Sequence, residues 1–396
     1  IREKHDHAGK QLFEDGNAWE ALSKILAAML NDPSLDGAIL IVDALDECKT
    51  NRHQLLDLIA TPSRVKWIVS SRNWQDIEEN LDNTKQKVRL HLELNKDSIS
   101  KAVDTYIGYK VDGLARHKKY DKETRDAVEN HLTSNADGTF LWVALVCQEL
   151  QSTDIWDVLG VIEKIPSGLE ALYDRMIRHI QNLGRRNPEM CRHVLSTVAV
   201  AYRPLRLEEL GRLSGLPSSI QRSTDHVSKI TSMCGSFLTI RDNVVYIIHQ
   251  SAKDFLFSSP FLFPSGITHQ HHALFSRSLR ALSETLRRDI YNLNVSGFPI
   301  DQVSPPDPDP LASIRYSCVF WVDHLDDSEP RAKMSDKDLQ DAGIVYDLLR
   351  KKYLYWLESL SLLRSMSEGV MAVQKLETLV VSCYKFTYKT GNGLTC

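Results

Sequence analysis

The chain has 396 residues, of which 42% are hydrophobic and 25% are charged, and its formal net charge is −4. These values are ordinary for a globular protein of roughly two to four domains. The slight excess of acid gives no electrostatic reason to expect a nucleic acid or an anionic membrane as a partner.

Seven cysteines are scattered along the chain, and none forms a Cys-x-x-Cys pair. Neither a zinc site nor a disulfide framework is indicated, and a reducing, cytoplasmic setting fits best. The longest apolar run, Phe140–Cys147, is too short to span a bilayer. The chain opens Ile-Arg-Glu-Lys, with no initiating Met and no targeting signal, which favours a fragment of a longer protein.

The first residues are polar, and Trp19–Leu30 then predicts a helix with one apolar face. Gly9-Lys10 invites comparison with a phosphate-binding P-loop. That interpretation fails, because Lys4 stands where the first Gly is needed and Gln11 stands where Ser or Thr is needed. The pattern Gly-x-x-x-x-Gly-Lys-Ser/Thr occurs nowhere in the chain.

The other predicted elements are organised around Ala38–Cys48. Its aliphatic run, Ile39–Val42, predicts a strand buried on both faces, as in a parallel sheet. The run ends at Asp43, and Asp46 and Glu47 follow within one turn, where open α/β sheets bind ligands. Asp43 alone would favour a strand that leads into a charged loop. Three acids at this spacing favour the Walker B arrangement of P-loop NTPases, in which an Asp holds Mg²⁺ and a nearby acid polarises the attacking water.

This stretch resembles the Walker B motif of NACHT NTPases, the signal-transduction ATPases that include animal innate-immune receptors and fungal incompatibility proteins. In that family a small residue follows the Mg²⁺-binding Asp and two acids close the motif, and Ala44, Asp46 and Glu47 match. The resemblance implies that Asp43 binds Mg²⁺ and that Asp46 and Glu47 position water. It also places the family's P-loop upstream, before Ile1.

After a helix at Gln54–Ala60, Val65–Ser71 predicts the next strand, and Arg72 follows it. By resemblance, Arg72 matches the sensor 1 position, where the family directs an Arg toward the γ-phosphate. The alternative is a surface Arg that opens a loop. Val88–Leu94 alternates apolar and polar residues and predicts an edge or last strand.

From Lys96 onward the pattern becomes helical, and the resemblance implies a small helical domain. The family's segment near the adenine ring is similar to Gly138–Trp142, but plain core is the preferred interpretation of Phe140, Leu141 and Trp142. The helices predicted here are Asp97–Tyr109, Asp121–Thr133 with Asp121 as cap, and Thr139–Leu150.

Helices followed by a β-hairpin predict a winged helix between Pro166 and Ser258. Glu208 and Glu209 and a tip that is not basic argue against DNA binding, which is kept as an alternative. The predicted helices are Glu170–Asn182, Cys191–Ala201 and Leu207–Leu213, and the predicted strands are Ser236–Ile240 and Val244–His249.

His249 ends the second predicted strand, within Ile-Ile-His-Gln-Ser-Ala-Lys-Asp-Phe-Leu. With Ser251, Asp254 and Phe255, this stretch resembles the winged-helix motif of NACHT proteins, whose His reaches the β-phosphate of bound ADP. The resemblance implies that His249 distinguishes nucleotide states, because the winged helix must be closed to supply it. The alternative is a histidine satisfied within the core or a turn.

Beyond the predicted winged helix, His269, His271 and His272 suggest a metal site, but no Cys or acid accompanies them at ligand spacing, so a solvated helix start is preferred. Residues 304–310 are rich in Pro and predict a rigid extended connector. The remaining predicted helices are Leu274–Leu286, Ala312–Leu325, Val345–Leu363 and Val370–Val381.

The predicted fold is therefore α/β and then mostly α. It comprises the C-terminal part of a P-loop NTPase parallel sheet (1–95), a helical domain (96–165), a winged helix (166–258) and a helical connector (259–396).

The predicted function is an ATP/ADP-dependent signalling switch of the NACHT type in fungal nonself recognition or incompatibility. Mg²⁺ and ATP or ADP are expected in the complete protein, with neither tight binding nor strong hydrolysis by this chain. The expected partners are further copies of the NACHT module and a repeat-type sensor beyond Cys396, with no nucleic acid and no membrane. The alternative is a nucleotide-independent helical scaffold or interaction module.

Overall fold

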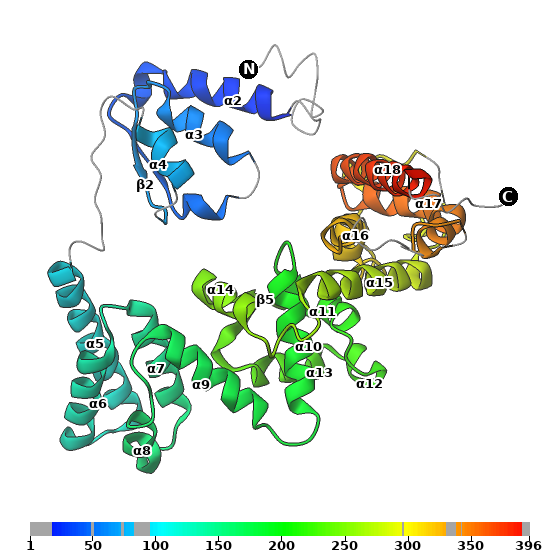
Figure 1. The fold of residues 1–396 in the computed structure, drawn as a ribbon. Helices are drawn as coiled ribbons and strands as arrows, with labels where there is room; N and C mark the ends of the chain where they lie inside the picture. Colours follow the sequence, from blue (N-terminus) through cyan, green and yellow to red (C-terminus); the bar gives the residue numbers. More distant parts are fainter. Residues whose placement is uncertain are drawn as a thin grey trace. The chain divides into compact units, whose positions relative to one another are not determined.

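The computed structural model describes residues 18–48, 51–72, 75–82, 96–294, 297–329, 338–341 and 343–389. These residues are mostly helical and contain two small sheets (Figure 1). The chain separates into two compact units, Ile1–Leu92 and Glu93–Cys396, and each is described here by itself. Within the described ranges, no helix combines the length and the apolar character needed to cross a bilayer.

The first unit contains a pair of parallel strands, β1 (Ile39–Val42) and β2 (Lys66–Val69), paired in register from Ile39 opposite Lys66 to Val42 opposite Val69. Between them lie the short helix η3 (Leu45–Glu47) and α3 (Arg52–Ala60), while α2 (Ala18–Leu30) precedes and α4 (Gln75–Asp82) follows. A small core forms around Leu45, Leu56, Ile59 and Ile77. The sequence predicted that these two strands are parallel and are connected by a helix, as the structure has them. The predicted strand Val88–Leu94 lies outside the described residues.

The expectation that β1 is buried on both faces is wrong. Ile39 is 57% exposed and Ile41 is 72% exposed, and Ile68 on β2 is exposed as well. Side chains alternate between the faces of a strand, and Val42 and Val69 on the opposite face pack against the small core. The described helices therefore cover one face of this strand pair.

The second unit begins with a helical group: α5 (Lys96–Lys118), α6 (Lys122–Asn135), α7 (Phe140–Ser152) and α8 (Val158–Ile162). Asp121 caps α6 as predicted, by accepting the Thr124 N–H at 2.8 Å. The indole of Trp142 is fully buried and donates to the Pro166 carbonyl at 3.0 Å, which confirms its interpretation as core. Phe140 is exposed, contrary to that interpretation.

Helix α5 runs nine residues beyond its predicted end at Tyr109. Val103, Ile107 and Val111 continue at helical spacing and are all buried. Burial of this stripe against α6 and α7 outweighs the low helix propensity of the two glycines that follow position 107.

Next come α9 (Leu169–Gln181), α10 (Asn187–Val200), α11 (Leu207–Leu213), α12 (Ser218–Gln221) and α13 (Thr224–Met233), followed by the hairpin of β4 (Leu238–Arg241) and β5 (Val244–Ile247) and by α14 (Gln250–Ser258). Asp242 and Asn243 at the hairpin tip both adopt positive φ, as a tight two-residue hairpin turn requires. The sheet order is β3-β5-β4 and both pairings are antiparallel. The third strand, β3 (Leu205–Arg206), was not predicted. Its buried residue Leu205 pairs with Val245.

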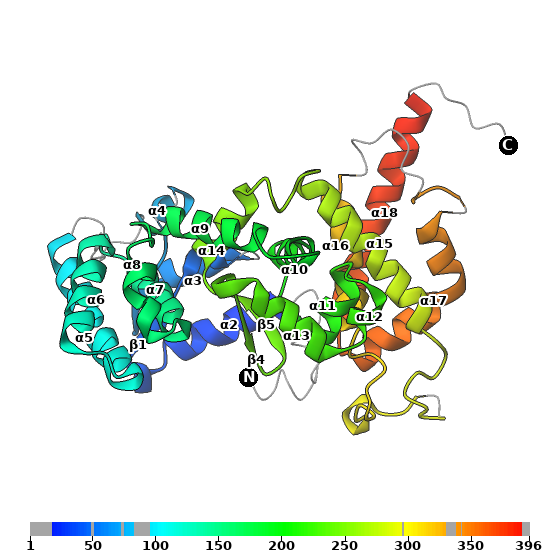
Figure 2. The ribbon, with the colours of Figure 1, turned by 90° about the horizontal axis from the view of Figure 1, so that it is seen from below.

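The last part contains α15 (Ile267–Thr285), α16 (Arg315–Asp327), α17 (Ile344–Leu362) and α18 (Met366–Lys389) around a second core (Figure 2). Residues 304–310 contain no helix, as predicted. Helix α15 starts at Ile267, seven residues before the predicted start. The prediction that the three histidines lie at a solvated helix start is wrong for His271. Its ring is buried and is hydrogen-bonded to His324 of α16.

Candidate functional site

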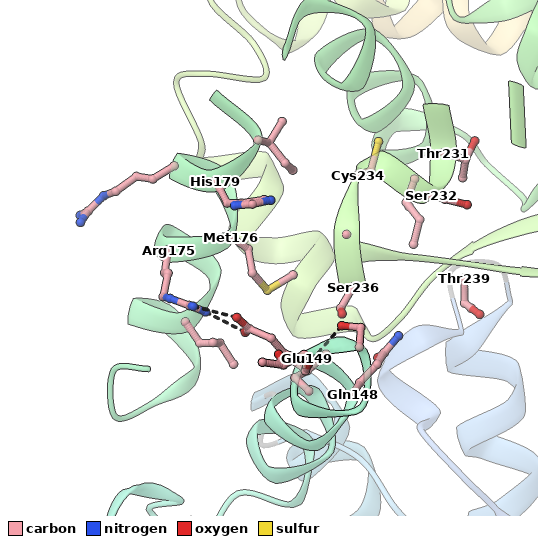
Figure 3. Close-up of a pocket in the computed structure, with 18 of the residues that line it drawn as sticks. Gln148, Glu149, Arg175, Met176, His179, Thr231, Ser232, Cys234, Ser236 and Thr239 are labelled. Atoms are coloured by element: carbon pink, nitrogen blue, oxygen red, sulfur yellow. Dashed lines mark hydrogen bonds and ion pairs between the residues drawn. The ribbon is translucent and has the colours of Figure 1, made fainter. Parts of the chain in front are cut away.

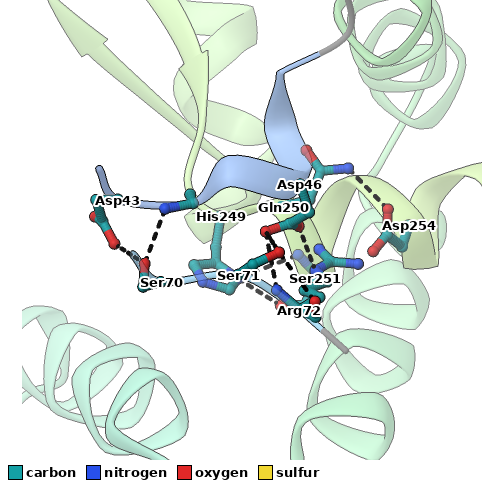
Figure 4. A network of polar contacts seen from close by, with 10 residues as sticks. Asp43, Asp46, Ser70, Ser71, Arg72, His249, Gln250, Ser251 and Asp254 are labelled. Carbon is teal, nitrogen blue, oxygen red and sulfur yellow. Dashed lines mark hydrogen bonds and ion pairs between the residues drawn. The ribbon is translucent and has the colours of Figure 1, made fainter. Parts of the chain in front are cut away.

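The C-terminal ends of the two parallel strands are tied together by Ser70. Its hydroxyl donates to the Asp43 carboxylate and accepts the Ala44 N–H at 2.9 Å (Figure 4). The Leu45 N–H in turn donates to the Ser70 carbonyl at 2.9 Å. The strand ends are thus fixed side by side, with the exposed Asp43 carboxylate at the edge where parallel sheets bind ligands.

Ala44 adopts a left-handed conformation, with φ 52° and ψ 51°. A non-glycine residue pays a steric cost there, of about 1–2 kcal/mol. The turn directs Leu45 into the core and Asp46 toward β2. A β-branched or bulky side chain would be a more severe outlier in this conformation, which gives a structural reason for a small residue after Asp43.

Asp46 is only 8% exposed and is occupied by Arg72. Its carboxylate accepts the Arg72 N–H at 3.0 Å and lies 3.3 Å from Nε of the same residue. The Ser71 hydroxyl lies 3.5 Å from it. Asp46 therefore anchors the segment that leaves β2 and orients an Arg that is itself partly exposed.

The structure thus separates the acids that the sequence grouped together. Asp43 and Glu47 are exposed, whereas Asp46 is buried in its contact with Arg72. Carboxylate oxygens suit Mg²⁺, which commonly takes one or two of them and completes its shell with water and phosphate oxygens. Within the described ranges, no group of three or more His, Cys, Asp or Glu side chains could hold a metal ion. Asp43 and Glu47 are the exposed carboxylates at this edge of the strand pair.

His249 belongs to the second unit, where it caps α14. Its Nδ1 accepts the Ser251 N–H at 3.1 Å and lies 2.8 Å from the Ser251 hydroxyl (Figure 4). Tyr173 lies 3.0 Å from the same hydroxyl, and burial raises the pKa of Tyr173, so its O–H stays a donor. Since Nδ1 is an acceptor, the neutral ring carries its hydrogen on Nε2. The cap thereby presents an N–H donor on an exposed ring.

A cavity of about 930 Å³ lies in the second unit, along α7, α9 and β4 (Figure 3). Its wall includes the ion pair of Glu149 and Arg175, whose two N–H···O bonds both measure 2.7 Å, together with His179 and Thr239. No sequence motif predicted it, because its wall comes from segments as far apart in the sequence as Leu145 and Ile240. It holds mixed polar groups without a nucleophile–base pair.

The geometry around Asp46 yields a first prediction. Asp46→Ala removes the acceptor of the Arg72 N–H, so the opening free energy of that amide should fall by about 1.5–3 kcal/mol, the worth of a hydrogen bond to a charged group. Hydrogen exchange resolved to the 70–72 segment measures this. Glu47→Ala is the matched control, since Glu47 is the exposed neighbour. Equal effects of the two substitutions would show that Asp46 does not anchor Arg72.

Comparison with known proteins places this geometry in context. Residues 2–72 match the family model described as Nephrocystin 3, N-terminal. The chain is 45% identical, over 402 aligned residues, to the vegetative incompatibility protein HET-E-1 of Podospora anserina. That alignment covers 96% of this chain and 29% of HET-E-1, so the chain spans less than a third of its relative. No solved structure matches the chain. The predicted resemblance to fungal incompatibility proteins is confirmed.

Proposed function

We propose that this chain, a homologue of a vegetative incompatibility protein, is part of a nucleotide-dependent signalling switch of the NACHT type that acts in fungal nonself recognition. The observation that carries the proposal is the pair of parallel strand ends, where Asp43, Ser70 and the Asp46–Arg72 contact lie together. The similarity to HET-E-1 over nearly the whole chain supports the biological setting. The boundaries 1–95, 96–165, 166–258 and 259–396 are part of the proposal, with 166–258 as a winged helix.

In this mechanism each residue acts through the chemistry of its own surroundings. Asp43, oriented by the Ser70 hydroxyl, would hold Mg²⁺ beside the phosphates. Exposed Glu47 would position water, while Asp46 would contribute by holding Arg72, whose guanidinium can contact the γ-phosphate. His249 would donate from Nε2 to the β-phosphate of ADP, because its Nδ1 is engaged by Ser251. Bound Mg²⁺–nucleotide would supply the metal ion and the phosphate charges with which these side chains interact.

The remaining parts of the switch follow from the same proposal. The partners would be further copies of the NACHT module and a repeat-type sensor, with the protein acting in the cytoplasm. Neither a nucleic acid nor a membrane is part of the mechanism. A nucleotide-independent scaffold is the competing function.

A titration separates the two functions. We expect the 396-residue chain to bind Mg²⁺–ADP weakly, with a Kd between about 0.1 and 10 mM, because a P-loop Lys and its cradle of N–H groups normally supply most of the phosphate affinity. Asp43→Asn should abolish the Mg²⁺-dependent part of the signal. Asp36→Asn, an exposed acid just before β1, is the matched control. Binding unaffected by Asp43→Asn would favour the scaffold, and sub-micromolar binding would mean that another loop replaces the cradle.

A further inference from the structure

A buried chain of hydrogen bonds connects the end of α10 to α16 and α15, which pack side by side (Figures 1 and 2). The Tyr202 N–H donates to the Tyr316 hydroxyl oxygen at 3.1 Å. That hydroxyl lies 2.8 Å from Nε2 of His324, and Nδ1 of His324 lies 2.9 Å from Nδ1 of His271. Tyr316 and His324 are fully buried and His271 nearly so. The proposed nucleotide switch uses none of these groups.

The positions of the hydrogens in this relay follow from its first bond. The Tyr316 oxygen accepts the Tyr202 N–H, and the other polar contact printed for this hydroxyl among the described residues is Nε2 of His324, to which its own hydrogen is therefore directed. A neutral imidazole with Nε2 as acceptor carries its hydrogen on Nδ1. His324 therefore donates from Nδ1 to Nδ1 of His271, whose own hydrogen lies on Nε2. In this arrangement the Tyr316 hydrogen and the His324 hydrogen each have an acceptor, whereas the opposite tautomer of His324 leaves the Tyr316 hydrogen without that acceptor.

An added proton breaks this relay wherever it binds. On Nδ1 of His271 it faces the N–H of His324, so two donors meet at 2.9 Å. If His324 changes tautomer to relieve that contact, its Nε2–H faces Tyr316, and the Tyr316 hydrogen loses its acceptor. A donor left unpaired in a buried site costs free energy. Protonation therefore favours any conformation in which the two rings are exposed to water.

The surrounding charges do not offset that cost. Asp327, whose Oδ2 is 3.9 Å from Nδ1 of His271, is half-exposed and already accepts the Tyr202 O–H at 2.5 Å. Burial lowers the pKa of His324 far below its ordinary value, with a contribution from His271, and burial also lowers the pKa of His271 against the opposing effect of Asp327. Two pairs of charged side chains close to the relay neutralise each other: Arg203 with Glu209, and Lys375 with Asp323.

We propose that the Tyr202–Tyr316–His324–His271 relay is an acid-sensitive latch, which holds α15 and α16 against the end of α10 at neutral pH and releases them on acidification. The closed form binds fewer protons than the open form. The free energy by which the relay stabilises the closed form is therefore fully present above about pH 6.5, and it decreases as the pH falls below that value. Each proton taken up on opening multiplies the opening constant by up to about tenfold per pH unit.

Hydrogen exchange of α16 in the full chain, corrected for intrinsic rates, tests the latch between about pH 5 and pH 8. The opening constant of the wild-type protein should rise on acidification. His271→Asn keeps an acceptor near Nδ1 but cannot titrate. The opening constant of this variant should therefore depend less steeply on pH than that of the wild-type protein, by up to about tenfold per pH unit. His269→Asn, an exposed position on the same helix, should keep the wild-type slope. Identical slopes in all three proteins would overturn the proposal.

A second measurement needs no variant and stands if His271→Asn fails to fold. Nitrogen-15 spectra of the histidine side chains report the tautomer of each ring directly. At neutral pH we expect His324 with its hydrogen on Nδ1 and His271 with its hydrogen on Nε2. Either ring in the opposite tautomer, or already protonated at neutral pH, contradicts the relay.

Discussion

Replacing Glu209 with alanine is expected to lower the free energy of unfolding of the second unit by about 1.5–3 kcal/mol, the contribution of hydrogen bonds to a charged group. The Glu209 side chain is 0% exposed, and its carboxylate receives both terminal nitrogens of Arg203, at 2.9 and 2.7 Å. It also accepts the N–H of Arg206 at 2.9 Å and the N–H of Tyr316 at 3.0 Å. Without it, two backbone donors lose this acceptor, and the Arg203 guanidinium retains its hydrogen bond to the Pro204 carbonyl.

The neighbouring Glu208 provides the matched control. One of its carboxylate oxygens is buried without a hydrogen-bond partner, so Glu208→Ala should change stability by no more than about 0.5–1 kcal/mol. Urea denaturation of both variants, with hydrogen exchange to assign the transition to α11 and α16, makes the comparison. If Glu209→Ala loses no more stability than Glu208→Ala, the buried carboxylate does not stabilise this junction.

Glu209 also shows where reasoning from sequence ends. Two adjacent acids at the start of a helix, Glu208 and Glu209, are typical of a solvent-exposed surface. The argument against DNA binding treated both as surface charges. The structure buries Glu209, so its charge is neutralised by Arg203 and does not reach solvent. Arg203 is six residues away, but Tyr316 is 107 residues away, and no local pattern shows that they meet. The same distance in sequence hides the pairing of His271 with His324.

Helices were predicted well where a buried stripe repeats within one segment, as in α9 and α10. Helix α13 (Thr224–Met233) was missed, although the Ser223 cap and the spacing of Val227 and Ile230 could have indicated it. The β1 strand was recognised from its aliphatic run, but its exposed face was not, since apolar residues alone do not reveal what covers them. The burial of a strand depends on which other segments pack against each of its faces, and the pattern of residues within the strand does not identify those segments.

In the candidate site, too, some features could be predicted from the sequence and others required the structure. Spacing and family resemblance singled out Asp43, Asp46, Glu47, Arg72 and His249. The buried position of Asp46 beneath Arg72 and the link from Ser70 to Asp43 needed three-dimensional contacts. The signal for Ser70 was present, because it directly follows the strand that pairs with β1. The tautomer of His249 follows only from its cap on α14.

The capping role of His249 determines how its part in the switch must be tested. In a longer form of the protein that carries a phosphate-binding loop and retains ADP, His249→Ala should remove a charge-assisted hydrogen bond worth about 1.5–3 kcal/mol. The open population should then rise about ten- to a hundredfold and give ligand-independent oligomers in size-exclusion chromatography. The same substitution also removes the helix cap, which alone costs about 0.5–2 kcal/mol.

His249→Asn separates these two effects. Asn is a favourable N-cap, so it preserves the start of α14 while it removes the Nε2 donor. If His249 reads the β-phosphate, both variants oligomerise without ligand and lose ADP, whereas Asp43→Ala weakens only the binding that depends on Mg²⁺. If His249→Asn remains monomeric and retains ADP while His249→Ala does not, the ring serves as a cap for α14. Of the residues in the proposed switch, Arg72, whose guanidinium is held in place by Asp46, would then be the one left to distinguish nucleotide states.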